Sequence, residues 1–245
     1  MQIKIYKDYK SLSIAVADEI INTVKHNPTA MLCLASGDTP RLAYSFVVQK
    51  CREDNIDLNK CTFVALDEWM GIPPDNEGSC QYFLRQTMFT PLNVPEHNIH
   101  FFNALAKDPQ NECNKMNAII QDKGGIDLMV VGIGMNGHIG FNEPSETLQQ
   151  YAHIVDLDET SKTVGQKYFK ESTALTTGIT LGLSHMLESR QVILMANGLK
   201  KSGIIKKTIE EEVSPQLPAT TIRNHANGFV MLDEDAASLL RKVED

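Results

Sequence analysis

One glycine-rich segment of the chain carries residues suited to proton transfer. Residues 132–144 read Gly-Ile-Gly-Met-Asn-Gly-His-Ile-Gly-Phe-Asn-Glu-Pro and follow the run 127–131, which is typical of a buried parallel strand. Glycines leave a backbone that can adopt positive φ and approach a ligand closely. Histidine is the residue type that titrates nearest neutral pH, and glutamate is a tunable carboxylate. His138 and Glu143 therefore suit acid–base chemistry at the carboxyl end of a strand. We therefore interpret this segment as an active-site loop.

The same segment also matches the dinucleotide-binding pattern G-x-G-x-x-G, which acidic residues follow about 20 positions later. The matching residues are Gly132, Gly134, Gly137, Asp156 and Asp158. A dinucleotide site requires the third glycine to open a long helix that holds the pyrophosphate. Gly140 and Pro144 interrupt that stretch, and a proline inside a helix costs about 3 kcal/mol. This interruption disfavours a nucleotide site. The second alternative to an active-site loop is a purely structural turn that carries a surface histidine.

A second candidate segment reads Ser36-Gly37-Asp38-Thr39-Pro40 and lies between a predicted strand and a predicted helix. Its free backbone N–H groups, its glycine and its two hydroxyls can cradle a phosphate. An ordinary helix cap would explain the same residues equally well, because Ser, Asp and Thr are common capping residues. Lys167 and Lys200 are candidates for the positive charge beside a phosphate, although a single lysine is more often a surface residue.

Two adjacent carboxylates, Asp67 and Glu68, end another predicted strand. Neighbouring strand residues point in opposite directions, so one carboxylate can face a ligand while the protein holds the other. Solvated acidic residues at a strand end are the ordinary alternative. A phosphate cradle combined with an aspartate, a histidine and a glutamate suits proton transfer next to a carbonyl. The phosphate would supply binding energy that positions the reacting carbons.

The elements that must position these residues alternate between strand-like and helix-like periods. We predict strands at residues 3–6, 30–34, 62–66, 127–131, 191–196 and 228–232, and helices at 9–26, 42–51, 79–88, 109–123 and 235–243, with a further helix ending near 211. This alternation predicts a three-layer α/β/α fold around a mostly parallel, Rossmann-like sheet. Neither a repeat nor a linker divides the chain, so we expect a single domain of residues 1–245. Ligand chemistry then belongs at the carboxyl ends of the strands.

Composition and charge narrow the classes of function. A hydrophobic fraction of 42% and a charged fraction of 22% are ordinary for a globular protein, and a net charge of −8 argues against non-specific binding to nucleic acid or anionic membranes. The five cysteines lack the spacing of a zinc site, and the chain carries no convincing nucleotide motif. We therefore expect neither a metal nor a cofactor. The N-terminus has no apolar signal core, and no apolar run approaches the ~18 residues of a membrane span. We therefore expect a cytoplasmic protein with a small-molecule substrate.

These segments resemble the glucosamine-6-phosphate deaminase family, whose members are deaminating isomerases of amino-sugar phosphates. The resemblance covers essentially the whole chain and is carried by residues 35–40, residues 66–69 and the His-Ile-Gly-Phe-Asn-Glu-Pro core of residues 138–144. Residues 123–128 and 177–183 look like the galactosamine-6-phosphate branch, so the identity of the amino sugar stays open.

The resemblance also implies roles for individual residues. Asp67 would move a proton between C2 and C1, His138 would open the pyranose ring, and Glu143 would orient and tune His138; the products would be a ketohexose 6-phosphate and ammonia. The matching phosphate-binding positions are Ser36, Gly37, Thr39 and Lys200, with Lys167 where some members carry an arginine. Asn136 stands where some members have an aspartate that assists ring opening. Because an asparagine cannot take up a proton at neutral pH, we expect Glu143 alone to support His138.

Two other functions compete with this interpretation. A 6-phosphogluconolactonase has a related fold and phosphate loop, but lactone hydrolysis does not need the carboxylate of Glu143. A catalytically silent sugar-phosphate sensor would keep the phosphate cradle without needing a working base. Residues 145–154 lack the basic pair that regulated hexameric members use for an allosteric sugar phosphate, so we expect an unregulated enzyme. The oligomeric state, monomer or homo-oligomer, stays open.

Overall fold

A seven-stranded sheet runs through the centre of the computed structural model, which describes residues 1–241. The strand order is β1-β10-β9-β6-β2-β3-β5, and every neighbouring pair is parallel. The strands are β1 (Gln2–Tyr6), β2 (Met31–Leu34), β3 (Thr62–Ala65), β5 (Ile99–His100), β6 (Leu128–Val131), β9 (Gln191–Ala196) and β10 (Gly228–Asp233). This is the mostly parallel, Rossmann-like α/β sheet that the alternating sequence pattern predicts.

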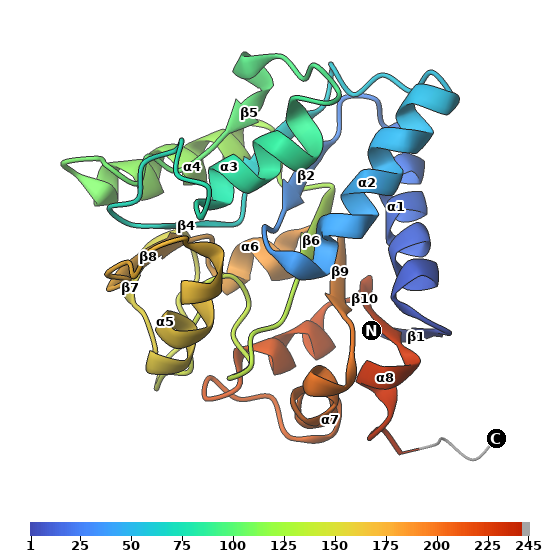
Figure 1. Cartoon of the computed structure of the whole chain (residues 1–245), viewed down its shortest axis with the longest axis vertical. Helices are drawn as coiled ribbons and strands as arrows, with labels where there is room; N and C mark the ends of the chain where they lie inside the picture. Colours follow the sequence, from blue (N-terminus) through green and yellow to red (C-terminus); the bar gives the residue numbers. More distant parts are fainter. Residues whose placement is uncertain (242–245) are drawn as a thin grey trace.

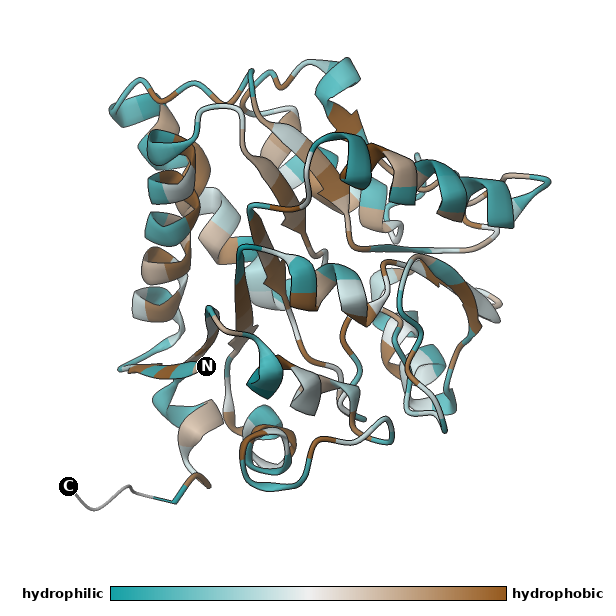
Figure 2. Cartoon of the chain, turned by 180° about the vertical axis from the view of Figure 1, so that it is seen from behind, coloured by the Kyte–Doolittle hydropathy of each residue, from teal (hydrophilic) through white to brown (hydrophobic). Residues whose placement is uncertain are grey.

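Helices cover both faces of this sheet. The long helices α1 (Tyr9–His26) and α2 (Asp38–Glu53) lie side by side on one face (Figure 1). The other face packs against α4 (Pro109–Asp122), α6 (Leu183–Glu188), α7 (Ser202–Glu210) and α8 (Glu234–Ala237). Figure 2 shows the inner strands as hydrophobic and the outer surface of the long helices as largely hydrophilic. None of the helices among residues 1–241 is long and apolar enough to cross a bilayer.

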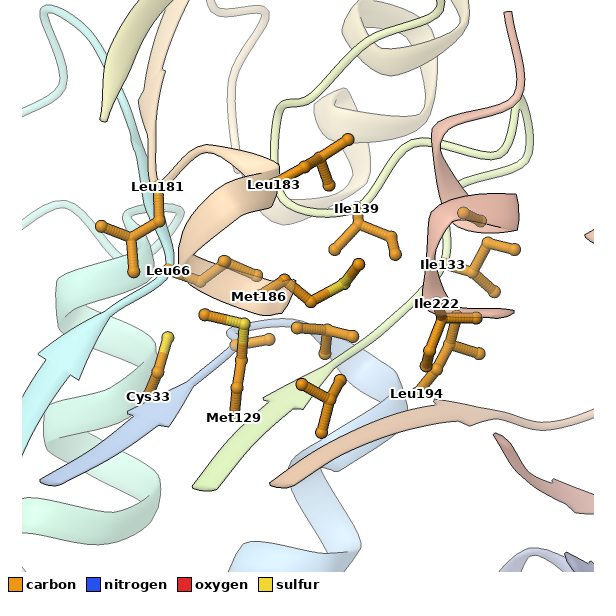
Figure 3. Packing of buried hydrophobic residues seen from close by; sticks show 14 of the residues in the cluster. Cys33, Leu66, Met129, Ile133, Ile139, Leu181, Leu183, Met186, Leu194 and Ile222 are labelled. Carbon is orange, nitrogen blue, oxygen red and sulfur yellow. The ribbon is translucent and has the colours of Figure 1, made fainter. Parts of the chain in front are cut away.

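Burial on both faces explains why the inner strands are apolar at nearly every position. In β6, Met129 belongs to the hydrophobic cluster on one side of the sheet and Val130 to the cluster on the other side. Figure 3 shows Cys33, Met129 and Leu194 on neighbouring strands, with Met186 and Leu183 of α6 packed over them. Both core clusters are therefore built on the same strands, whose carboxyl ends stay fixed relative to one another.

A second, antiparallel sheet with strand order β4-β8-β7 lies beside the central one (Figure 1). It contains β4 (Asp67–Trp69), β8 (Thr177–Thr180) and β7 (His153–Asp156). In the sequence, α3 (Cys80–Leu84) follows β4 and α5 (Glu159–Gly165) follows β7. Short 3₁₀ turns between these elements are η2 (Glu96–Asn98), η3 (Gln166–Tyr168), η4 (Leu199–Lys201) and η5 (Pro218–Asn224). The strand predicted at residues 62–66 therefore ends at Ala65, and Asp67 starts a strand of the second sheet.

Two predicted helices differ from the structure. The helix expected at residues 79–88 is divided into α3 and a π-helical turn, η1 (Arg85–Phe89). The helix expected at residues 235–243 is limited to Glu234–Ala237, while residues 242–245 lie outside the described part of the chain. Apolar spacing locates a helix, but it does not determine the number of residues per turn or the last turn.

Candidate active site

A cavity of about 390 Å³ opens at the carboxyl ends of the central strands. Its walls come from the loop after β2, from β4, from the loop after β6, and from α5 and η3. The sequence-predicted residues that line it are Ser36, Gly37, Thr39, Asp67, His138 and Lys167. Segments that are far apart in the sequence thus place their candidate residues around one space. Asn136 and Glu143 lie behind this wall, where they contact His138.

The two adjacent carboxylates of β4 point to different surroundings, as the sequence predicts. Asp67 is 9% exposed and lines the cavity. Glu68 is turned away and its carboxylate accepts hydrogen bonds from the backbone N–H groups of Trp69, Cys80 and Gln81 at 2.8–2.9 Å. Glu68 therefore anchors the start of α3 to β4, which leaves Asp67 as the carboxylate that faces a ligand.

Burial gives Asp67 the properties of a base. Loss of solvent raises the pKa of Asp67 to about 6, an effect that the Cys80 thiol and the nearby His138 partly oppose. A carboxylate with this pKa is ionised at neutral pH, but it is more basic than a carboxylate in water. A general base is most effective when its pKa lies near the working pH.

His138 is held from behind by a carboxylate. Its Nδ1 lies 3.1 Å from Glu143 Oε2. Burial tends to raise the pKa of Glu143, but hydrogen bonds from His138, Ser161 and Asn136 outweigh it and leave the pKa below its usual value. An ionised Glu143 only accepts hydrogen bonds, so this network assigns the proton to Nδ1 and leaves Nε2 of a neutral His138 without one. Nε2 is then free to accept a proton from a ligand.

Ser161 is a contact of His138 that sequence reasoning missed. This serine of α5 is 4% exposed, and its Oγ lies 3.0 Å from His138 Nδ1. Glu143 is therefore not the only side chain among the described residues that contacts the His138 ring nitrogen, and the expectation that Glu143 alone supports ring opening stays a prediction. A serine near the start of a helix is common, and only the packing of α5 against the glycine-rich loop distinguishes this one.

Gly134 shows why the loop needs glycine at one of its positions. The His138 ring lies so close to its backbone that a methyl group added at Gly134 would lie 2.4 Å from Nε2. Any side chain there would displace the histidine. The alternative of a dinucleotide-binding loop also fails, because the described residues 132–158 contain no helix that could hold a pyrophosphate.

The loop after β2 has the properties of a phosphate cradle. Gly37 occupies the N-cap position of α2 with a φ of +106°, which only glycine adopts readily. No side chain within residues 1–241 caps this helix, so its first N–H groups are available to a ligand. The ordinary helix cap that the sequence left open is therefore not formed. An uncapped helix N-terminus that faces a cavity favours an anion.

Two lysines supply positive charge to this end of the cavity, but one of them is not the predicted residue. Lys167 lines the cavity, with its Nζ 2.8 Å from Asp38 Oδ2. Lys200 is exposed and is not part of the wall, whereas Lys201 lines the cavity and donates a hydrogen bond to the Ile133 carbonyl at 2.5 Å. Consecutive side chains of a 3₁₀ turn project about 120° apart, so only one of the two lysines of η4 can face inward.

Burial strongly affects Lys201. Loss of solvent, aided by the positive charge of Lys167, lowers the pKa of Lys201 to about 8. A cation held in partly dry surroundings gains more from an incoming anion than a cation in water does. For a metal ion, by contrast, the described residues contain no suitable group of three or more His, Cys, Asp or Glu side chains.

The sequence as a whole matches known proteins. It fits the family profile described as glucosamine-6-phosphate isomerases/6-phosphogluconolactonase over residues 8–231. It is 34% identical to the glucosamine-6-phosphate deaminase of Thermoanaerobacter pseudethanolicus over 98% of this chain and 95% of that protein. It is 36% identical to the enzyme of the same name from Alkaliphilus oremlandii over 98% of this chain and all of that one. The chain belongs to this family of sugar-phosphate enzymes.

Solved structures of the family have the same architecture. A monomeric glucosamine-6-phosphate deaminase superposes with a TM-score of 0.94 at 29% identity, covering 98% of this chain and 100% of that one. The 6-phosphogluconolactonase of Trypanosoma brucei superposes with a TM-score of 0.75 at 17% identity, with 98% of both chains covered. The second similarity shows a shared fold alone.

Proposed function

We propose that this member of the family is an amino-sugar-6-phosphate deaminase, which converts the aldose substrate into a ketohexose 6-phosphate and ammonia by acid–base catalysis. The observation that carries the proposal is the cavity itself. A buried carboxylate, Asp67, and a histidine backed by a carboxylate, His138, line the same space as an uncapped helix N-terminus and two lysines. The deaminase names of the relatives at 34% and 36% identity support the same reaction.

The phosphate of the substrate would bind at the N-terminus of α2. Ser36, Gly37 and Thr39 would contribute backbone N–H groups and hydroxyls, while Lys167 and Lys201 would contribute charge. Binding of this remote group would place the sugar carbons near Asp67 and His138, and neither of these two residues would be needed to bind the phosphate. Its free energy then serves to position the reacting atoms.

His138 would open the ring. Its neutral imidazole accepts the proton of the C1 hydroxyl at Nε2 and returns a proton to the ring oxygen, which breaks the C1–O5 bond and produces the open-chain aldehyde. Glu143 stabilises the imidazolium that forms in between, because it accepts the Nδ1 hydrogen. Asn136 donates to the same Glu143 oxygen at 2.8 Å and so fixes the carboxylate.

Asp67 would then carry the isomerisation. Its carboxylate removes the proton from C2 while the aldehyde oxygen on C1 takes up a proton from solvent, which gives an enolamine across C1 and C2. Asp67 then returns the C2 proton to C1. The resulting iminium at C2 takes up water, the C–N bond breaks, and ammonia leaves with the ketone at C2. Proton abstraction by a carboxylate whose pKa is near 6 is efficient at neutral pH, where the base is ionised.

Parallel assays of the purified protein test this proposal. Glucosamine 6-phosphate, galactosamine 6-phosphate and 6-phosphogluconolactone are supplied separately, and ammonia, ketohexose 6-phosphate and 6-phosphogluconate are measured. We expect equal amounts of ammonia and ketose from at least one amino sugar, and the two amino sugars decide the epimer. Lactone hydrolysis without ammonia would establish the lactonase alternative. Saturable binding of every sugar phosphate without turnover would establish the sensor.

A further inference from the structure

The side-chain amide of Asn136 joins three segments around the candidate catalytic histidine. Its Nδ2 donates to Glu143 Oε2 at 2.8 Å and to Asp158 Oδ1 at 3.3 Å. Its Oδ1 accepts from the backbone N–H of His138 at 3.2 Å. Both amide hydrogens are therefore used on carboxylates, and the orientation of the amide is determined by its partners.

Asp158 is the residue through which α5 takes part in this arrangement. It is the N-cap of α5, and its Oδ1 accepts from the backbone N–H of Thr160 at 2.8 Å. The first turn of the same helix carries Ser161, whose Oγ is 3.0 Å from His138 Nδ1. The start of α5 thus meets the glycine-rich loop at two points, one on Asn136 and one on His138.

The charges around Asn136 allow an amide at this position but oppose a carboxylate. An aspartate there would have no hydrogen to donate, and it would place a third negative charge between those of Glu143 and Asp158. Carboxylates this close cannot all stay ionised at neutral pH, so one of them takes up a proton. Glu143 must stay ionised if it is to accept the Nδ1 hydrogen of His138.

We propose that Asp158 is a positioning residue for the acid–base site and that Asn136 and Asp158 function as a matched pair. Asp158 accepts one hydrogen of the Asn136 amide, and this bond orients the amide so that its other hydrogen is donated to Glu143. Glu143 in turn fixes the tautomer of His138. The catalytic role of His138 rests on the proposed function, but the pairing of Asn136 with Asp158 stands on the geometry alone.

A double-mutant cycle tests the pair, with Asn136→Asp, Asp158→Asn and the two changes combined. Asparagine caps a helix as well as aspartate does, so Asp158→Asn keeps the start of α5 intact. We expect Asn136→Asp to lower kcat/KM by on the order of 10-fold or more at pH 7 and to add an ionisation near neutral pH to its profile. Adding Asp158→Asn should recover at least about 5-fold of that loss and move the ionisation back toward the acid side. A double variant no better than Asn136→Asp alone would overturn the inference.

A second measurement separates this inference from the proposed function. The Nδ1 proton of His138 can be followed by NMR as a function of pH in all four proteins, whether or not they turn over a sugar. We expect its titration to be displaced in Asn136→Asp and largely restored in the double variant. If the wild type releases no ammonia but the titration follows this pattern, the proposed function fails and the pair stands. Identical titrations in Asn136→Asp and the double variant would reject the pair.

Discussion

At the scale of single residues, burial determines how the charged groups of the cavity behave. Burial lowers the pKa of Lys201 to about 8, and a bound phosphate dianion would raise that pKa again because it stabilises the charged form. Lys200, its neighbour in the sequence, is exposed. The sequence shows two consecutive lysines after a strand and does not reveal which of them faces inward, because that depends on how η4 is packed.

The two lysines form a matched pair of test positions. We expect Lys201→Ala to raise KM for the sugar phosphate by on the order of 10- to 100-fold with a smaller change in kcat, because its charge acts on a remote group of the substrate. Lys200→Ala should change KM by less than about 2-fold. In the wild type, KM should rise as the pH increases above about 8, where the empty enzyme loses the Lys201 charge. Equal effects of the two substitutions would contradict the assignment of Lys201.

At the scale of elements, the candidate active site depends on the second, smaller sheet. Strand β4 places Asp67 in the cavity, and its neighbour β8 supports the glycine-rich loop through Phe141. The apolar runs of the sequence predicted every strand of the central sheet except the two-residue β5. They did not predict β7 or β8, because strands of four residues that alternate in burial or contain a glycine have a weak pattern.

A pair of glycine substitutions tests this support. An added methyl group at Gly178 of β8 would lie 2.5 Å from the Phe141 ring, which would have to shift. We expect Gly178→Ala to lower the free energy of unfolding by about 1–3 kcal/mol and to reduce kcat, since Phe141 is two residues from Glu143. At Gly203 of α7 the new methyl group has no described atom within 4 Å apart from its chain neighbours and the backbone of its own helix. Gly203→Ala should therefore leave kcat unchanged and stabilise the protein by up to about 1 kcal/mol. Chemical denaturation and steady-state assays provide both numbers, and a Gly178→Ala protein as stable as Gly203→Ala would argue against the contact.

At the scale of the whole molecule, the residues of the candidate site were easier to predict than the contacts between them. Motif order and spacing predicted that Asp67, His138, Glu143 and the segment 36–40 would lie together, because parallel strands bring their carboxyl ends to one edge of a sheet, and these residues do lie around or directly behind one cavity. Ser161 and the contact between Asn136 and Asp158 depend on how α5 packs against the glycine-rich loop. Local sequence patterns contain no information on such a contact between distant segments.

Burial of the Asp67 carboxylate should affect the free energy of unfolding of the whole protein. Burial raises the pKa of Asp67 from 3.8 to about 6, so the folded state binds more protons than the unfolded state between these values, and its stability falls as the pH rises through this window. Asp67→Asn removes the ionisation. We expect the variant to match the wild type near pH 4 and to be more stable by about 1–3 kcal/mol at pH 7, as measured by denaturation at both pH values. The effect of burial would be contradicted if the free energy of unfolding of Asp67→Asn, minus that of the wild type, were smaller at pH 7 than at pH 4.

The most direct test of the central claim uses NMR to follow the C2 proton of whichever amino-sugar 6-phosphate, glucosamine or galactosamine, the wild type turns over. The proton is followed in the presence of wild-type protein or Asp67→Asn. The claim is that Asp67 removes this proton while the phosphate is held at the N-terminus of α2. We predict that the wild type consumes the C2 signal as ketose and ammonia form. Asp67→Asn should bind the sugar phosphate and leave that signal intact, with a rate lower by on the order of 1000-fold or more. Loss of the C2 proton in Asp67→Asn within about 10-fold of the wild-type rate would show that another group is the base.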